Sequence, residues 1–497
     1  MNPNPFGRTF WVALCAMVAA LALSAAAYVN EPFRMPAFFL LAAAFAVTAV
    51  ARWDVAVLVL LGEIFIGSYG RLFAISVHEY SVSLRYAFFA IFIIVWILRL
   101  LLRREAPPAL PKRVWQLLGV LVVALAAGVA VGIMRGNSMA NVFNDANAYG
   151  YLLLLLPIVT SFGVAAQKRR VVQVLAAAVV TITVQTLALL AIFSHQYSFI
   201  RMVYRWVRTT RMDEITQVGY NFVRVFSPTQ LYCLVGFFFF FFLALFAGSL
   251  TRRQRGGAVL LCALALTTVL ISMSRTFWLS LAVGFLVIIA VLLRHGWTTR
   301  KFAVLAGRGL LVLAGSLLVI SFTANYPYLL NRPGAPLTFS FFTDRTLALD
   351  EAAIYSRYDL IVPMLSAGIT RPLLGSGFGT TVTFTSHDPR ALAVNNGRRT
   401  TYAFEWGYLD MWLKTGLFGL LIFLAALVLL CRALWHTARR AQESSGVFLG
   451  LFLAVIVVAA SHITSPYLNH PLGLGISVIA AAYALAARQP APQRPAP

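Results

Sequence analysis

Residues 230–250 read QLYCLVGFFFFFFLALFAGSL, an uncharged apolar run with six consecutive phenylalanines at 237–242. A run of roughly 20 apolar residues is long enough to cross the hydrocarbon core of a bilayer as an α-helix. A second apolar run surrounds the five leucines at 152–156. The sequence therefore predicts a protein that crosses a membrane several times.

The composition of the whole chain agrees with this prediction. Of its 497 residues, 60% are hydrophobic and only 11% are charged, whereas a typical globular chain is ~45–50% apolar and ~25% charged. A soluble fold could not bury so much apolar surface. This excludes a soluble multidomain enzyme.

Apolar stretches between charge clusters predict about fourteen spanning helices. They lie near 10–29, 35–50, 55–68, 86–102, 114–134, 149–166, 171–193, 230–250, 258–273, 277–293, 309–324, 406–430, 446–460 and 471–487. The expected fold is an all-α polytopic membrane helical bundle of about 12–14 transmembrane helices, with two long periplasmic loops that contain short helices. The expected parts are amino-terminal transmembrane helices in 1–193, a periplasmic Arg-rich loop in 194–229, transmembrane helices in 230–324, a large periplasmic loop in 325–405, carboxy-terminal transmembrane helices in 406–487 and a cytoplasmic tail in 488–497.

The basic residues predict the orientation of the chain. There are 40 Lys+Arg against 16 Asp+Glu, a net charge of +24. In a membrane protein this excess follows from the positive-inside rule, so we expect the membrane itself rather than nucleic acid as the partner. Basic clusters fall on alternate connections, which we expect to face the cytoplasm together with both termini.

Two long connections on the opposite side carry an excess of arginine that this rule does not explain. Residues 194–229 contain five arginines and residues 325–405 contain seven. Arg201, Arg205 and Arg208, with Arg211, recur at helical spacing and predict a helix that lies in the membrane interface with its guanidinium groups outward. Such a helix is equally suited to ordinary anionic lipid headgroups and to a specific anionic substrate.

No metal site or cofactor is expected. The four cysteines lie in apolar runs without CxxC spacing, which argues against a disulfide framework or a cysteine metal site. No His, Asp and Glu set has convincing ligand spacing. The acids within spans, Glu63 and Asp410, are most simply partners of neighbouring polar groups.

Several motifs lie in or beside the two long connections. Arg224 precedes a Ser-Pro pair and a span, and Arg275 stands in a very short turn between two spans. An arginine at that membrane edge must snorkel or be paired. A helix is expected at about 347–366 with Arg357, ended by Thr370-Arg371-Pro372 because proline disfavours continuation. Residues 372–379 form a glycine-rich turn in which the backbone could approach a ligand closely, although without a flanking strand and helix it is no dinucleotide fingerprint.

In order, spacing and sidedness, these motifs together resemble the bacterial O-antigen ligase and O-antigen polymerase superfamily. The motifs are Arg224 before Ser-Pro, Ser274-Arg275, Arg357 before Pro372-Leu-Leu-Gly375-Ser-Gly377, and Tyr408-Leu409 before Gly416-Leu-Phe-Gly419. The resemblance covers roughly residues 220–430. It implies a metal-independent, inverting glycosyltransferase of the bacterial inner membrane that acts at the periplasmic face.

The resemblance also implies the substrates and their contacts. The donor is a glycan linked to undecaprenyl diphosphate, and the acceptor is lipid A core for a ligase or another lipid-linked glycan for a polymerase. On this resemblance Arg224 and Arg275 would hold the diphosphate. We further expect Arg357 to contact glycan or phosphate and Arg201, Arg205 and Arg208 to recruit the carrier. Preorganised arginines suit such a reaction because negative charge accumulates on the departing diphosphate. A chain-length regulator is a further candidate partner.

The acceptor hydroxyl must lose a proton to a base. Many ligases of this family have a histidine followed by asparagine before the corresponding span, and here Glu405 and Trp406 occupy that place. Glu405 is therefore the candidate base, with His387 as a second candidate. This departure favours a polymerase. Polymerases of this family carry an arginine followed eleven positions later by glycine in each of two large periplasmic loops, and this chain is similar in having Arg208 with Gly219 and Arg357 with Gly368.

The alternative from another class is a lipid-linked oligosaccharide flippase. A transporter of that kind should place charges near the bilayer midplane and repeat its two halves. The arginines cluster instead in two outward connections, and no internal repeat is evident. The sequence therefore favours an enzyme.

Overall fold

A computed structural model of the chain describes residues 3–77, 80–218, 222–326 and 352–488. Within these residues the chain is mostly helical, and eleven helical segments are long and apolar enough to cross a membrane. The predicted all-α polytopic bundle is therefore confirmed. The long segments are α1 (Arg8–Val29), α2 (Glu31–Ala51), α4 (Leu84–Leu101), α5 (Lys112–Met134), α6 (Met139–Ala146) with η1 (Asn147–Leu154) and α7 (Leu155–Ser161), α8 (Ala165–Ser194), η2 (Pro228–Gln230) with α10 (Leu231–Phe246), α11 (Arg252–Ser272), α12 (Arg275–Arg294), α13 (Thr299–Asn325) and α17 (Gly407–Arg440).

Three further apolar helices are shorter: α3 (Trp53–Ile66), α18 (Ser445–Ser461) and α19 (Pro471–Ala486). With these, every predicted span overlaps a helix of the structure. Most residues of the three helices are buried against other helices rather than left facing lipid. The two intramembrane acids are paired, as expected: Glu63 of α3 with Arg85, and Asp410 of α17 with Lys414.

The centre of the bundle is α10, the helix that contains the six phenylalanines. About 83% of its spanning window is buried, because α8, α11 and α18 pack around it. The large aromatic side chains of this run fill the space between these helices, and Phe238, Phe240 and Phe242 are fully buried. The stretch that most strongly predicts a membrane span is therefore core rather than lipid-facing surface.

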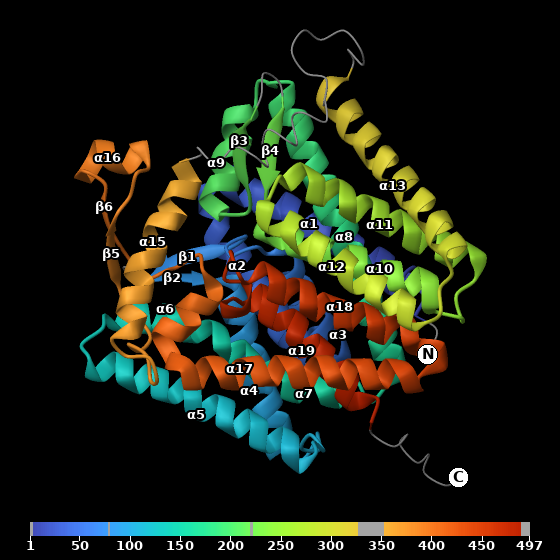
Figure 1. Ribbon diagram of the computed structural model, residues 1–497, viewed down its shortest axis with the longest axis horizontal. Coiled ribbons are helices and arrows are strands. Elements are labelled where there is room, and N and C mark those ends of the chain that lie inside the picture. Colours follow the sequence, from blue (N-terminus) through green and yellow to red (C-terminus); the bar gives the residue numbers. More distant parts are fainter. Residues whose placement is uncertain (1–2, 78–79, 219–221, 327–351, 489–497) are drawn as a thin grey trace.

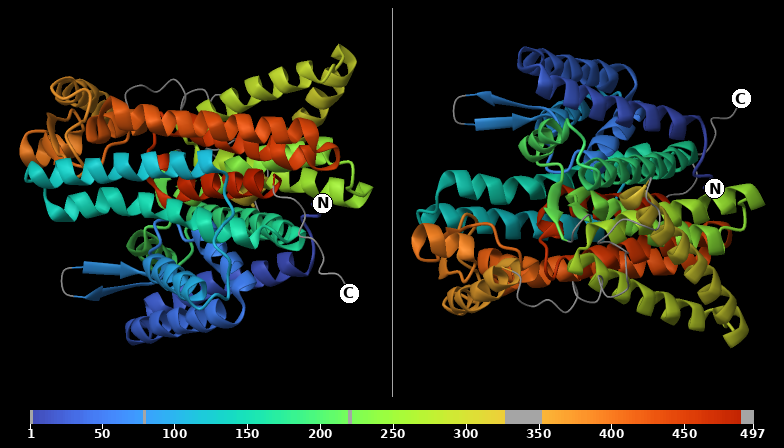
Figure 2. Two further views of the ribbon diagram at one scale, coloured as in Figure 1. Left: turned by 90° about the horizontal axis from the view of Figure 1, so that it is seen from below. Right: turned by 90° about the horizontal axis from the view of Figure 1, so that it is seen from above.

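Three antiparallel hairpins and three further helices occupy one end of the bundle. The remaining elements are β1 (Ala74–Val77), β2 (Tyr80–Ser83), α9 (Ile200–Thr210), β3 (Glu214–Gln217), β4 (Val223–Phe226), α15 (Ala352–Ile369), β5 (Val382–Thr385), α16 (Pro389–Asn395), β6 (Arg398–Thr401), η3 (Gln442–Ser444) and η4 (Tyr467–Asn469). The hairpins pair β1 with β2, β3 with β4 and β5 with β6, and with α9, α15 and α16 they lie away from the end where α1 starts and α19 finishes (Figures 1 and 2). Both long arginine-rich connections therefore contribute to the same end.

The helix expected near 347–366 is α15, which ends at Ile369 just before the predicted stop at Thr370-Arg371-Pro372. Its expected first residues, 347–351, lie outside the described residues. The hairpins were not expected from the sequence. Their four-residue strands are too short to give a clear alternation of apolar and polar residues.

The glycine-rich turn at 372–379 packs against helices, which corrects the idea that it approaches a ligand. Gly377 has φ +82°, and a Cβ there would lie 2.2 Å from the backbone nitrogen of Gly132 on α5. On the other side, its N–H donates to the carbonyl of Lys414 at 3.0 Å. Gly416, with φ +67°, interrupts α17 where the turn crosses it. The glycines permit three backbones to meet, and this fixes the base of α15.

Candidate active site

Arg224 and Arg275 are brought together through the end of α11. The Nε of Arg224 on β4 donates to the carbonyl oxygen of Ser272 at 2.8 Å. Ser272 is the last residue of α11, where carbonyls lack helical partners, and Met273 then turns the chain with φ +46°. Arg275 follows as the first, half-buried residue of α12. The short turn between two spans therefore places both arginines at the same end of the bundle.

A row of aromatic side chains starts beside Arg224. The guanidinium carbon of Arg224 is 4.9 Å from the ring centroid of Phe226, within cation–π range. The ring of Phe277 lies 5.9 Å from Phe226 and 6.0 Å from Tyr467, so the row runs from β4 through α12 to η4. Side-chain hydroxyls reinforce the same contact, since Thr276 Oγ1 is 2.7 Å from Thr464 Oγ1. This packing holds the start of α12 in place.

Arg357 and Glu405, two residues predicted separately, form an ion pair. The Nε of Arg357 on α15 donates to the carboxylate of Glu405, and the side chains remain 38% and 51% exposed. The neighbouring Trp406 donates from its indole Nε1 to the carbonyl of Arg357 at 2.9 Å. Burial and the charge of Arg275 lower the pKa of Arg357. Arg357 is therefore in electrostatic contact with Arg275 while it is paired with the candidate base.

Tyr467 lies where these groups meet. Burial raises the pKa of its phenol, Tyr69 and Glu214 raise it further, and the guanidinium groups of Arg224 and Arg357 lower it. Charged groups from β3, β4 and α15 therefore act on one buried hydroxyl of η4. We call Arg224, Arg275, Arg357, Glu405 and Tyr467 the outer cluster.

A polar cavity of about 300 Å³ adjoins the outer cluster through Glu214. Its lining includes two arginines, Arg208 and Arg211, and the acidic residue Asp213. Asp213 is buried and accepts a hydrogen bond from Gln185 Nε2 at 2.6 Å. Burial raises the pKa of Asp213 to about 7. The cavity therefore offers positive charge beside a carboxyl group that titrates near neutral pH.

The arginines of α9 are divided between the cavity and the surface. Arg201, Arg205 and Arg208 are exposed, while Val207 is buried and Trp206 donates to Ser24 Oγ on α1 at 3.2 Å. The predicted arginine face is therefore present. Of these three arginines, only Arg208 lines the cavity.

Arg211 does not continue the helix as its spacing predicted. It adopts φ +52° and ends α9, and the Ser68 hydroxyl donates to its carbonyl oxygen at 3.0 Å. This sharp turn brings Arg211 into the cavity lining beside Arg208. The regular spacing thus predicted correctly that Arg201, Arg205 and Arg208 lie on one helix, but Arg211 lies just beyond the end of that helix.

His387, the second candidate base, is held by Asp359 of α15. Its Nδ1 lies 2.9 Å from Asp359 Oδ1, and its backbone N–H donates to the other carboxylate oxygen at 2.8 Å. Residues two apart on a helix point in different directions, so Asp359 and Arg357 face different sides of α15. His387 is therefore paired with Asp359 and not with either residue of the Arg357–Glu405 ion pair.

A buried charge network supports the segment that carries Glu405. The ammonium of Lys414 on α17 contacts Asp145 of α6 at 2.8 Å and Asp410 at 2.6 Å, and it donates to the carbonyl of Tyr402 at 2.9 Å. The three charged side chains are at most 9% exposed. Asp410 also accepts from Asn469, at the end of η4. The network thereby fixes the chain on both sides of Glu405 relative to η4.

Several of these groups were missed in the sequence. Tyr69 and Tyr467 lie in short connections, and Asp213 and Glu214 lie in the first long connection. None of the four belongs to a sequence motif, and these three segments meet only through the fold. The sequence analysis also missed Arg71, which is close enough to the cavity residue Arg211 for the charge of Arg211, together with burial, to lower the pKa of Arg71. Of the two arginine–glycine pairs, Gly219 lies outside the described residues. Gly368 packs against Trp412, and a Cβ there would lie 2.7 Å from the indole ring.

Comparison with known proteins relates part of this site to a known family. Residues 260–424 match a family described as O-antigen ligase. The matched segment contains Arg275, Arg357 and Glu405, whereas Arg224, the cavity and Asp145 lie outside it. No curated protein matches the chain. Together with the multi-pass helical bundle, the match supports a glycosyltransferase-like membrane enzyme that acts on a lipid-linked glycan. The resemblance of this chain to the O-antigen ligase and O-antigen polymerase superfamily is thereby confirmed.

Proposed function

We propose that the protein transfers a glycan from undecaprenyl diphosphate to a sugar hydroxyl of an acceptor. The observation that carries this proposal is the convergence of arginines from separate elements, Arg224 of β4, Arg275 of α12 and Arg357 of α15, beside a cavity that Arg208 lines. Guanidinium groups bind phosphate oxygens in paired hydrogen bonds. A diphosphate is the ligand that best matches such a cluster at one end of a membrane bundle.

This end of the bundle is assigned to the periplasm of a bacterial inner membrane. The basic clusters at the other ends of the helices favour the cytoplasm, with both termini there. On this assignment the connections 194–229 and 325–405 are periplasmic. Their excess of arginine is then explained by an anionic partner on that side of the membrane. Arg201 and Arg205, exposed on α9, would attract the carrier before its diphosphate reaches Arg208.

The proposed chemistry is a direct displacement. The acceptor oxygen forms a bond to the anomeric carbon as the bond from that carbon to the diphosphate oxygen breaks. The leaving diphosphate takes the bonding electrons, and the arginines stabilise its growing negative charge. Attack from the side opposite the diphosphate inverts the anomeric configuration.

Glu405 is the proposed acceptor of the hydroxyl proton. Before donor binding it is paired with Arg357, whose positive charge also faces Arg275. A diphosphate would draw Arg357 toward itself, because it carries more negative charge than one carboxylate. This exchange would release the Glu405 carboxylate to act as a base. Asp213 is the alternative base, because its pKa of about 7 suits proton transfer at neutral pH.

The acceptor distinguishes a polymerase from a ligase. We favour a polymerase, because Glu405 replaces the histidine of many ligases and because the arginine–glycine spacing recurs in both long connections. A polymerase acts on a second lipid-linked glycan, and a chain-length regulator is its expected partner. A ligase acts on lipid A core instead.

The direct test uses the full-length protein in detergent with an undecaprenyl-diphosphate-linked oligosaccharide as donor. Elongation of the glycan without added core, seen on a gel, is expected for a polymerase, and transfer only to added lipid A core indicates a ligase. Failure of both transfers, with movement of the carrier across proteoliposomes, overturns the proposal in favour of a flippase. The exposed Arg398→Gln on β6 provides a control for loss of positive charge at the same end.

A further inference from the structure

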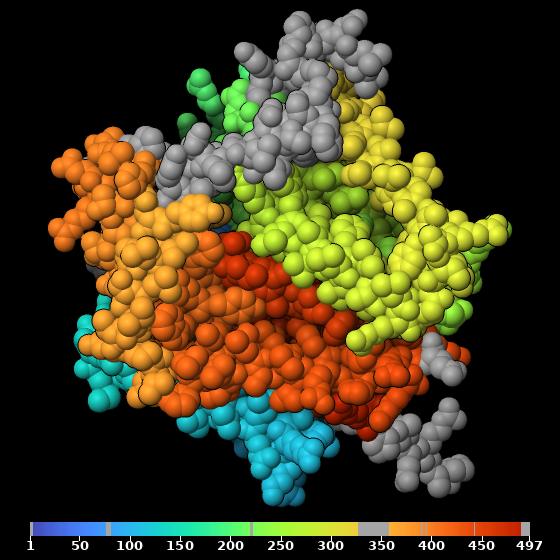
Figure 3. All heavy atoms as spheres, in the orientation of Figure 1, coloured from blue at the N-terminus to red at the C-terminus, as the bar shows by residue number. Residues whose placement is uncertain are grey.

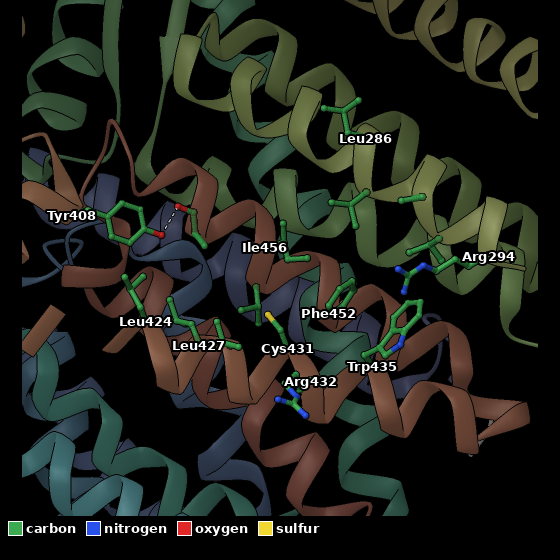
Figure 4. A pocket seen from close by; sticks show the side chains of 16 residues that line it. Leu286, Arg294, Tyr408, Leu424, Leu427, Cys431, Arg432, Trp435, Phe452 and Ile456 are labelled. Carbon is green, nitrogen blue, oxygen red and sulfur yellow. Dashed lines mark hydrogen bonds between the residues drawn. The ribbon is translucent and has the colours of Figure 1, made fainter. Parts of the chain in front are cut away.

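A second, apolar site lies between α12, α17 and α18. A groove of about 640 Å³ separates these helices, and its lining includes Leu286, Val291, Leu427, Cys431, Phe452 and Ile456. In the space-filling view α12 and α17 stand on either side of the recessed α18 (Figure 3), and the side chains that line the groove are drawn in Figure 4. At one end Tyr408 closes the groove by donating to the carbonyl of Ala459 at 2.8 Å.

The other end of the groove is basic. Arg294 and Arg432 line the groove there, and the guanidinium carbon of Arg294 lies 6.0 Å from the ring centroid of Trp435. A second cavity of about 590 Å³ shares Arg294 and Trp435 with the groove and adds His295 and Arg439. The apolar groove thus adjoins a cavity that is lined by two arginines, Arg294 and Arg439.

The part of α12 that lines the groove is about as long as one leaflet of a bilayer is thick. From Leu286 to Arg294 along α12, the rise is about 12 Å at ~1.5 Å per residue. One leaflet contributes about 15 Å, half of the ~30 Å hydrocarbon core. Trp435, beside the arginines, is the type of residue that lies at the membrane interface. The basic pocket therefore lies at headgroup level when the groove lies in the acyl region.

We propose that this groove binds one anionic phospholipid, with an acyl chain along the apolar lining and the phosphate between Arg294 and Arg439. The proposed phosphate position lies at the far end of α12 and α17 from Arg275 and Glu405, whereas the apolar groove extends to Tyr408 near the start of α17. The phosphate position is therefore distinct from the proposed diphosphate site, and this proposal does not depend on the proposed function. A guanidinium near the membrane surface attracts an anionic headgroup. A zwitterionic lipid with the same chains fills the groove but gains less from the arginines.

A lipid in this position joins the helices that carry the outer cluster. Arg275 is the first residue of α12, and Glu405 immediately precedes the start of α17. An acyl chain in the groove would contact the apolar side chains of these helices that do not contact one another across it. Binding to the folded state alone raises the unfolding temperature by mass action.

The test compares phosphatidylglycerol and phosphatidylcholine with identical acyl chains, by native mass spectrometry of the delipidated full chain. Wild-type protein is expected to retain phosphatidylglycerol preferentially. The Arg294→Gln/Arg439→Gln variant should lose affinity by roughly fivefold for each guanidinium removed. The matched control, Arg255→Gln/Arg300→Gln, removes two exposed arginines near the starts of α11 and α13 that line neither cavity and should keep the preference.

A second readout locates the lipid. Phosphatidylglycerol with a photoreactive acyl chain is expected to label peptides that contain residues 286–294, 424–435 and 452–459. Equal retention of the two lipids, an unchanged preference in the Arg294/Arg439 variant, or labelling elsewhere overturns the proposal. Displacement of phosphatidylglycerol by undecaprenyl phosphate would also overturn it, since the polyprenyl carrier would then be the occupant.

Discussion

The ammonium nitrogen of Lys414 lies 2.8 Å from Asp145 Oδ1, which joins two residues 269 positions apart in the sequence. Lys414 belongs to the segment that matches the family, and Asp145 belongs to the amino-terminal half that does not. Both side chains are almost completely buried. The position of Glu405 therefore depends on a charge from outside the recognised segment, because Lys414 also holds the Tyr402 carbonyl.

Replacing Lys414 with methionine should strongly destabilise the protein. The change leaves Asp145 and Asp410 as buried carboxylates without their cation, and breaking a buried ion pair in this way costs about 3–5 kcal/mol. Thermal unfolding in detergent measures the effect. The control Lys112→Met removes an exposed lysine at the start of α5 and should leave the midpoint unchanged. Equal midpoints for the two variants would contradict the structural role of Lys414.

Replacing Arg275 with alanine should abolish most glycan transfer while the protein still folds. Removing one preorganised donor to a developing negative charge lowers kcat by about 10²–10³-fold. Arg224→Ala should reduce transfer as well, and it should also lower stability because the bond to Ser272 is lost. The rate of donor consumption and the unfolding midpoint are measured together, with Arg398→Gln as the control. Transfer that survives in Arg275→Ala would exclude its role at the diphosphate.

Glu405→Gln should lower kcat with little change in KM. Loss of a general base reduces the rate by about 10²–10⁴-fold, and glutamine preserves the size of the side chain. The control is Glu443→Gln, which changes an exposed acid in η3 away from the outer cluster. Initial rates over a range of donor concentrations separate kcat from KM. A normal kcat in Glu405→Gln would transfer the role of base to another group, with Asp213 tested next by Asp213→Asn.

The stability of the protein should fall as the pH rises from about 4 to 7, through the carboxyl group of Asp213. Its pKa is raised from 3.8 to about 7 in the folded state, so over this range the folded chain keeps a proton that the unfolded chain has lost. Unfolding midpoints at pH 5 and pH 8 measure the change. The Asp213→Asn variant should show a smaller decrease between these two values. An identical pH dependence in wild type and variant would show that Asp213 does not titrate as proposed.

The glycine-rich turn offers a test of packing without any substrate. Gly377→Ala should lower the unfolding midpoint, because its Cβ would overlap the backbone of α5 and its φ of +82° disfavours any side chain. Gly119→Ala on α5 has open space around the new Cβ and should leave stability unchanged or slightly raised. If Gly377→Ala matched Gly119→Ala, the turn would not be wedged between α5 and α17.

The sequence alone determined the membrane character and the spans, and it indicated several residues of the candidate site. Hydropathy depends on local composition, so apolar runs such as 230–250 identify helices whatever their neighbours are. Arg224, Arg275 and Arg357 were predicted because each lies in or beside a short motif, and the motifs follow one another in the order typical of the superfamily. Pairing of Glu63 and Asp410 was also foreseen, since an unpaired charge is costly within a membrane.

Tertiary structure alone decided what these residues contact. Arg357 pairs with Glu405, 48 positions away in the sequence, and Lys414 pairs with Asp145, 269 positions away. Local periodicity in the sequence cannot predict pairs between residues so far apart. Tyr467, Asp213 and Glu214 come together because hairpins and helix ends fold over one end of the bundle. The sequence also left open whether the glycine-rich turn approaches a ligand or a helix, since glycines with positive φ permit close approach to either. Whether a segment forms a spanning helix depends on the hydropathy of that segment. Which distant side chains pair depends on how the helices pack against one another.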